Sequence, residues 1–142
     1  MKPYEIAAEV KPSERQLNWQ KTEFYGFINF GLATVLNREW TDGGVNPVNF
    51  NPEEFDAQEW VQFFKDAGFK GMVLNVKHHD GFCLWPTQLT EYCIRNSPYK
   101  DGKGDVVGEL AAACKKYGIK FAAYLSPWDR NHAEYATPAY VD

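Results

Sequence analysis

The chain has 142 residues, of which 44% are hydrophobic and 24% are charged, and its formal net charge is −4 at pH 7. This length suits one domain, so we expect residues 1–142 to form a single unit. Lys and Arg are scattered among acidic residues, which argues against a nucleic-acid partner. No apolar run approaches the ~20 residues of a membrane span, so no membrane partner is expected.

Residues 1–10 lack the apolar core of a signal peptide, which favours a cytoplasmic location for the chain as given. A secreted or periplasmic location follows if a signal has been removed. Three cysteines, Cys83, Cys93 and Cys114, form no CxxC pair, and free thiols in a reducing compartment are the simplest account. Nothing in the sequence indicates an oligomeric state.

The first half of the chain contains signals for two elements and a long loop. Ser13 and Gln16 match a capping box, which predicts a short helix over 13–19. The apolar run over 25–31 predicts a buried strand. The following stretch over 36–52 is rich in Gly, Asn and Pro, and ordered loops of this length are usually functional.

The second half predicts two helices, each followed by a glycine and a strand. Asp56 is expected to cap a helix over 57–67, with Glu59 in the reciprocal position and Gly68 as the stop. A strand over 71–77 and a second long loop over 82–104 follow. Asp105 then caps a helix that runs to Tyr117, Gly118 ends it, and 120–125 is the third strand.

The repeated order of helix, glycine, lysine and strand predicts the α/β class with a parallel sheet. A complete barrel needs about 250 residues and eight strands. We therefore expect an incomplete (β/α)₈ TIM-like barrel of about three β/α units, truncated before strand four. The alternative, a doubly wound nucleotide-binding domain, lacks a glycine-rich phosphate loop after its first strand.

Strand 71–77 predicts a polar group at the upper rim of the barrel. Alternation places Met72, Leu74, Val76 and His78 on one face and Val73, Asn75, Lys77 and His79 on the other. The second face is expected toward the lumen, with Asn29 from the first strand. A buried Lys77 needs an anionic partner, for which we expect Glu39.

Adjacent His78 and His79 can reach one ligand only if the strand breaks, and Asp80-Gly81 supplies a break. Three interpretations remain open: ordinary polar residues at a strand end, a zinc site in a metal-dependent hydrolase, or recognition of sugar hydroxyls. Glu39 and Trp40 pair a carboxylate with an indole, as a pyranose site would. Trp85 and Trp128 suit either core packing or a cleft wall.

Several motifs together resemble the α-L-fucosidases of glycoside hydrolase family 29. They are Phe27-Ile-Asn-Phe-Gly31, Arg38-Glu-Trp40, Lys77-His-His-Asp-Gly-Phe-Cys-Leu-Trp-Pro86, Gly104-Asp-Val-Val-Gly-Glu-Leu110 and Lys120-Phe-Ala-Ala-Tyr-Leu-Ser-Pro-Trp-Asp129. The resemblance implies a retaining hydrolase on a (β/α)₈-like barrel that removes terminal α-L-fucose from glycans without a metal or cofactor. It implies fucose contacts for His78, His79, Glu39 and Trp40.

The chain departs from the family pattern at two points. Asn29 stands where the family usually has histidine; its amide can still hydrogen-bond a sugar hydroxyl, but it cannot carry charge. The family nucleophile follows strand four, so we expect no catalytic residue within this chain and no fucosidase activity from it alone. The non-enzymatic alternative is a carbohydrate-binding fragment that holds sugar without cleaving it.

Overall fold

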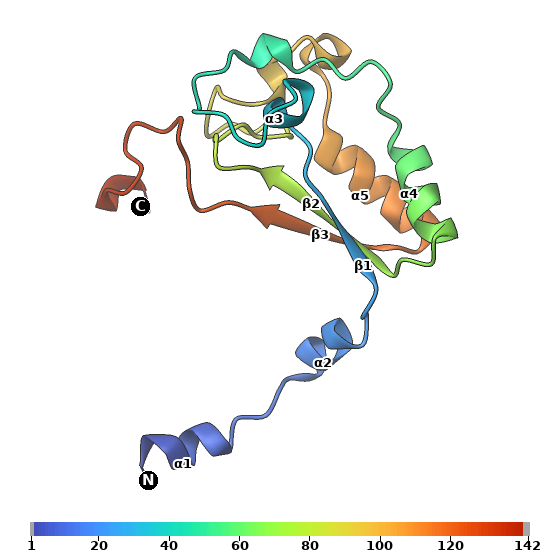
Figure 1. Ribbon diagram of the computed structural model, residues 1–142, viewed down its shortest axis with the longest axis vertical. Helices are drawn as coiled ribbons and strands as arrows, with labels where there is room; N and C mark the ends of the chain where they lie inside the picture. Colours follow the sequence, from blue (N-terminus) through green and yellow to red (C-terminus); the bar gives the residue numbers. More distant parts are fainter. Residues whose placement is uncertain (1, 141–142) are drawn as a thin grey trace.

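A parallel three-stranded sheet forms the centre of the protein, as the computed structural model of residues 2–140 shows (Figure 1). The strands lie in the order β1-β2-β3, and their bounds are β1 (Tyr25–Ile28), β2 (Gly71–Lys77) and β3 (Lys120–Leu125). Val73 of β2 pairs with Phe27 on one side and with Ala122 on the other. All three strands therefore end at the same edge, where the loops that follow them meet.

Two helices, α4 (Ala57–Asp66) and α5 (Val106–Tyr117), pack together and cover one face of the sheet (Figure 1). Asp56 caps α4 by accepting hydrogen bonds from the backbone N–H groups of Gln58 and Glu59, and Asp105 caps α5 through Gly108. The reciprocal bond expected from the Glu59 side chain is not formed among the described residues. Gly118 ends α5 in the left-handed conformation that favours glycine.

The hydrophobic core lies between these helices and the sheet. Its β2 members are Met72, Leu74 and Val76, all buried, which confirms the predicted face. The opposite face of the sheet remains open, and Phe27 is 55% exposed on it beside Tyr124. An apolar ring left in water at this position indicates a surface that further structure can cover.

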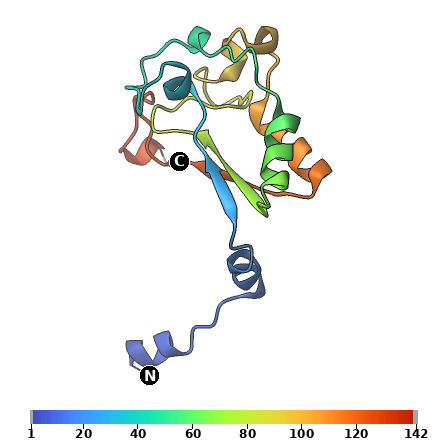
Figure 2. The same ribbon diagram turned by 45° about the vertical axis from the view of Figure 1, so that its right-hand side comes forward.

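The N-terminal segment extends away from the sheet as two short helices, α1 (Pro3–Ala8) and α2 (Glu14–Gln20) (Figure 2). The capping box of Ser13 and Gln16 is formed at the start of α2, as predicted. Helix α1 was not predicted. None of its residues is buried.

The first strand is shorter than predicted. It ends at Ile28, and the chain then turns into a short helix, α3 (Leu32–Val35), whose first residue is fully buried. Burial of Leu32 and Ala33 on the core therefore ends the strand before residue 31. Short 3₁₀ helices interrupt the strand-following segments at Pro47–Asn49, Ile94–Asn96, Tyr99–Gly102 and Pro138–Tyr140.

The protein is thus a small α/β domain with a parallel sheet, and its long loops follow the strands while tight glycine joints follow the helices. Both turns between a helix and the next strand lie where the repeat predicts them, at Gly68 and Gly118. Among residues 2–140, no helix has the length and apolar character that crossing a bilayer requires.

Candidate functional site

The turn after β2 places two imidazoles side by side. The backbone N–H of Gly81 donates to the carbonyl of His78 over 3.0 Å, and Gly81 has a φ of +91°. This turn ends the alternation of the strand, so His78 and His79 no longer point to opposite faces. Their ring centroids are 4.4 Å apart, which confirms the break predicted from Asp80-Gly81.

His79 lies among aromatic rings from the loops after the other two strands. Its centroid is 6.3 Å from the ring of Trp40, after β1, and 5.1 Å from that of Trp128, after β3. Trp40 is 54% exposed and Trp128 is 38% exposed, so both rings offer surface to a ligand. Indole faces beside an imidazole suit the apolar face and the hydroxyls of a sugar.

His78 is half-buried and lines a small recess with Asn29, Thr34, Asp80 and Phe82. Burial lowers the pKa of His78, the neighbouring His79 lowers it further, and Asp80 opposes the change. His78 is therefore neutral at pH 7, with one ring nitrogen as donor and the other as acceptor. Its Nδ1 atom has no hydrogen-bond partner within residues 2–140.

Asn29 belongs to the same recess but is engaged by the sheet. The amide of Asn75 donates to Oδ1 of Asn29 over 2.8 Å. This contact joins the end of β1 to the middle of β2 on the open face. Asn29 therefore stands at the border of the imidazole pair, with its own side chain still exposed.

Glu39 was predicted to pair with Lys77, and that prediction was wrong. Nζ of Lys77 lies 2.9 Å from Oδ2 of Asp129 and 3.3 Å from the hydroxyl of Tyr140. Glu39 is exposed on the loop beside Trp40. The carboxyl ends of parallel strands meet, so a carboxylate after β3 reaches Lys77 at the end of β2.

The ion pair of Lys77 and Asp129 is buried and fully ionised. Burial would lower the pKa of Lys77, but the hydrogen bond and charge of Asp129, aided by Tyr140, hold it above its ordinary value. Burial would likewise raise the pKa of Asp129, which Lys77 and the backbone N–H groups of His132 and Asn131 hold below its ordinary value. The Asp129 carboxylate thus binds Lys77 and the backbone of its own turn.

Asp80, the other rim carboxylate, is also occupied. It is 2% exposed, accepts the hydroxyl proton of Thr41 over 2.8 Å, and accepts the backbone N–H of Phe82 over 2.9 Å. Asp80 lines the recess of His78, but both of its oxygens already accept hydrogen bonds from protein groups.

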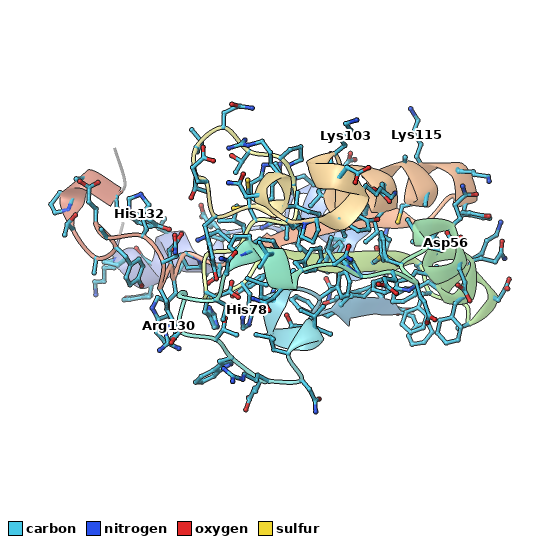
Figure 3. All side chains as sticks on the ribbon, turned by 90° about the horizontal axis from the view of Figure 1, so that it is seen from above. Asp56, His78, Lys103, Lys115, Arg130 and His132 are labelled. Atoms are coloured by element: carbon cyan, nitrogen blue, oxygen red, sulfur yellow. The ribbon has the colours of Figure 1, made fainter. Side chains whose placement is uncertain are left out.

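Sequence reasoning missed Ser126, whose hydroxyl is 2.7 Å from Nδ1 of His79. It also missed Arg130, whose guanidinium lies 5.5 Å from the ring of Trp128 and donates to the carbonyl of Thr41. Figure 3 shows Arg130 and His78 on one side of the molecule and Lys103 and Lys115 on the other. A search of every residue directly after a strand would have found Ser126.

The two remaining tryptophans have different surroundings. Trp85 is half-buried, packs against the hydrophobic core, and lines a recess with Lys77 and Asp129. Trp128 stands beside His79. The structure therefore brings Trp40, Trp128 and the imidazole pair together, and it places Trp85 with the core.

The zinc interpretation receives no support from side-chain geometry. Within residues 2–140, no three His, Cys, Asp or Glu side chains are arranged to hold a metal ion. Both oxygens of Asp80, the third member of the His-His-Asp sequence, accept hydrogen bonds from Thr41 and from the backbone of Phe82.

Comparison with known proteins gives consistent matches. Residues 4–142 match the family described as Alpha-L-fucosidase. The chain is 46% identical over 135 residues to Alpha-L-fucosidase 1 of Arabidopsis thaliana, covering 95% of this chain and 27% of that protein. It is 48% identical to Putative alpha-L-fucosidase 1 of Oryza sativa, covering 91% and 25%.

Solved structures agree with the sequence relatives. A glycoside hydrolase 29 family member from an unknown rumen bacterium is 53% identical, with a TM-score of 0.89 over 92% of this chain and 24% of that one. A Ruminococcus gnavus fucosidase of the same family, in complex with fucose, is 38% identical, with a TM-score of 0.80 over 87% and 26%. The chain spans about a quarter of the length of these relatives and matches their N-terminal part. It belongs to the α-L-fucosidase family, glycoside hydrolase family 29.

Proposed function

We propose that this chain forms the fucose-holding wall of a retaining α-L-fucosidase whose barrel continues beyond residues 1–142. The observation that carries the proposal is the convergence of His78, His79, Trp40 and Trp128 at the carboxyl ends of the strands, where barrel enzymes place their sites. The two imidazoles contact fucose hydroxyls, and Glu39 accepts hydroxyl protons beside the indole of Trp40.

The incomplete TIM-like barrel is part of this proposal. The parallel order β1-β2-β3, the helices on one face and the exposed Phe27 on the other suit three units of a (β/α)₈ barrel. Retaining hydrolysis requires two carboxyl groups roughly 5 Å apart. Asp80 and Asp129 serve the local structure, so the nucleophile and acid/base come from outside these residues.

A chimera tests the proposal at the level of activity. Residues 4–142 replace the matching N-terminal part of the Ruminococcus gnavus fucosidase, and release of p-nitrophenol from an aryl α-L-fucoside is measured. We expect turnover by the chimera and none by the 142-residue chain alone. Loss of two hydrogen bonds to a bound sugar costs roughly 2 kcal/mol, so His79→Ala should lower kcat/KM by ~30-fold or more.

His132→Ala is the matched control, because His132 is an exposed imidazole after β3 whose one ring hydrogen bond among residues 2–140 is accepted from the backbone N–H of Glu134. It should leave kcat/KM unchanged. A folded chimera in which His79→Ala and Trp40→Ala have no effect on kcat/KM would overturn the proposal. So would turnover by the 142-residue chain that is abolished by Asp80→Ala or Asp129→Ala.

A further inference from the structure

A buried hydroxyl joins the imidazole of His79 to the segment that carries Trp128. Ser126 directly follows β3 and is 0% exposed. Its Oγ lies 2.7 Å from Nδ1 of His79 and 3.1 Å from the backbone nitrogen of Trp128. No other hydrogen bond involves this hydroxyl within residues 2–140.

The position of Ser126 is fixed by the sheet rather than by its side chain. Its backbone N–H donates to the carbonyl of Lys77 over 2.9 Å, which continues the β2–β3 ladder past the last residue of β3. On the other side of the turn, the backbone N–H of Arg130 donates to the carbonyl of His79 over 2.9 Å. Two backbone hydrogen bonds therefore hold Ser126 and His79 at fixed positions relative to each other.

The direction of the protons follows from donor and acceptor counts. A backbone N–H only donates, so Oγ of Ser126 is the acceptor for Trp128. The serine hydroxyl then has one proton to donate, and among the described residues Nδ1 of His79 is the one acceptor within reach. If Nδ1 carried a proton instead, the hydroxyl proton would be buried without a partner, which folded proteins avoid.

We infer that Ser126 is a positioning residue that holds His79 in the tautomer with its proton on Nε2. Nε2 lies on the ring edge away from Ser126, and no residue in the range 2–140 bonds to it. His79 thus presents an N–H donor beside the rings of Trp40 and Trp128, and its ligand must offer a hydrogen-bond acceptor. Identifying that acceptor as a fucose hydroxyl rests on the proposed function; the tautomer does not.

The same hydroxyl couples ring orientation to the aromatic wall. Trp128 donates its backbone N–H to the same oxygen that holds His79. One hydroxyl therefore sets the tautomer of His79 and holds the backbone of Trp128 in the turn after β3. Ser126 therefore acts through two groups of the candidate site while being inaccessible to a ligand itself.

Histidine NMR tests this inference directly, because the chain has only three histidines. In the ¹⁵N-labelled full chain, at a pH of about 8 where ordinary imidazoles are neutral, long-range ¹H–¹⁵N spectra distinguish the two tautomers. Resonances are assigned with His78→Gln, His79→Gln and His132→Gln. We expect His79 to carry its proton on Nε2, with its Nδ1 resonance shifted by an accepted hydrogen bond.

Ser126→Ala should remove that Nδ1 shift and lower the ratio of the Nε2–H to the Nδ1–H tautomer severalfold, whereas Ser126→Thr should retain both. Ser97→Ala is the matched control, because Ser97 is a buried serine whose hydroxyl donates to the carbonyl of Ile94. It should leave the His79 signals in place.

Protonation of His79 on Nδ1 in the unsubstituted chain would overturn the inference, whatever the variants do. An unchanged His79 pattern in a folded Ser126→Ala chain would overturn it too. The measurement needs no sugar, so it is independent of the proposed function, which fails separately if the fucosidase chimera ignores His79→Ala.

Discussion

Removing the charge of Asp129 should destabilise the fold strongly, because it leaves the buried ammonium of Lys77 without its anionic partner. Asp129→Asn keeps the shape of the side chain and the oxygen that accepts the N–H groups of Asn131 and His132. It removes the charge 2.9 Å from Nζ of Lys77, whose side chain is 7% exposed. Breaking one partner of a buried ion pair costs about 3–5 kcal/mol.

Taking the lower end, because the amide preserves the backbone contacts, we expect a loss of about 3 kcal/mol in the free energy of unfolding. For a chain of this length, that corresponds to a fall in Tm of roughly 10 °C. Thermal and urea unfolding followed by tryptophan fluorescence measure both quantities. Lys100→Met is the matched control, because the Lys100–Glu109 pair is more exposed and should contribute under about 1 kcal/mol.

The pH dependence of the same variant gives a second test. The pKa of Asp129 is lower in the folded chain than in the unfolded chain. Its stabilisation is therefore present above the unfolded value of about 3.9 and is lost as pH falls through the folded pKa. Asp129→Asn should flatten stability against pH in this acidic range. The buried ion pair would be refuted if the variant were as stable as the unsubstituted chain and lost stability at acidic pH in the same way.

Three further predictions concern the turn, the thiols and the enclosed imidazole. Gly81→Ala should cost at least ~2 kcal/mol more in unfolding free energy than Gly68→Ala. Both glycines have positive φ, but only at Gly81 would a Cβ clash with the carboxylate of Asp129. Equal losses would contradict the clash. Burial raises the pKa of Cys83 to about 12 and that of Cys114 to about 11. Ellman's reagent should therefore label these thiols only after denaturation. Rapid labelling of the native chain would count against their burial. Burial holds the pKa of His78 below 6.5, so its NMR titration midpoint should fall under that value. Protonation of His78 should lower the free energy of unfolding as pH falls below about 6.5. A midpoint at or above 6.5 would exclude a buried, neutral imidazole.

Local signals predicted the element boundaries well. Asp56, Gly68, Asp105 and Gly118 act on the backbone within a few residues, and the helices between them begin and end where the sequence indicates. The error in the first strand has a tertiary cause, because burial of Leu32 on the core turns the chain after Ile28. Helix α1 has Pro3 at its first position but a lysine at its cap, which is a weak signal.

The site was predictable only in part, for the same reason. The break at Asp80-Gly81 is local, and it correctly indicated that both imidazoles meet. The need of Lys77 for an anion was also correct, but the partner was not, because Glu39 and Asp129 both follow strands. Choosing between them requires the path of the loop after β3, which the hydrogen bonds of Asp129 to its own turn determine.

Contacts between loops, rather than the sheet, fix the aromatic rings around His79. The loop after β1 reaches the loop after β2 where Thr41 donates to Asp80, and it reaches the loop after β3 where Asn131 donates to the carbonyl of Gly43 over 2.8 Å. Gly43 has a φ of +83°, and a Cβ there would lie 2.6 Å from the backbone of Arg130. At Gly43 the loop carrying Trp40 therefore comes close to the backbone of the loop carrying Trp128, and side-chain hydrogen bonds from Arg130 and Asn131 join the two loops. A small change at Gly43 must move one indole relative to the other, and a site that depends on two ring faces and a defined imidazole proton tolerates little displacement.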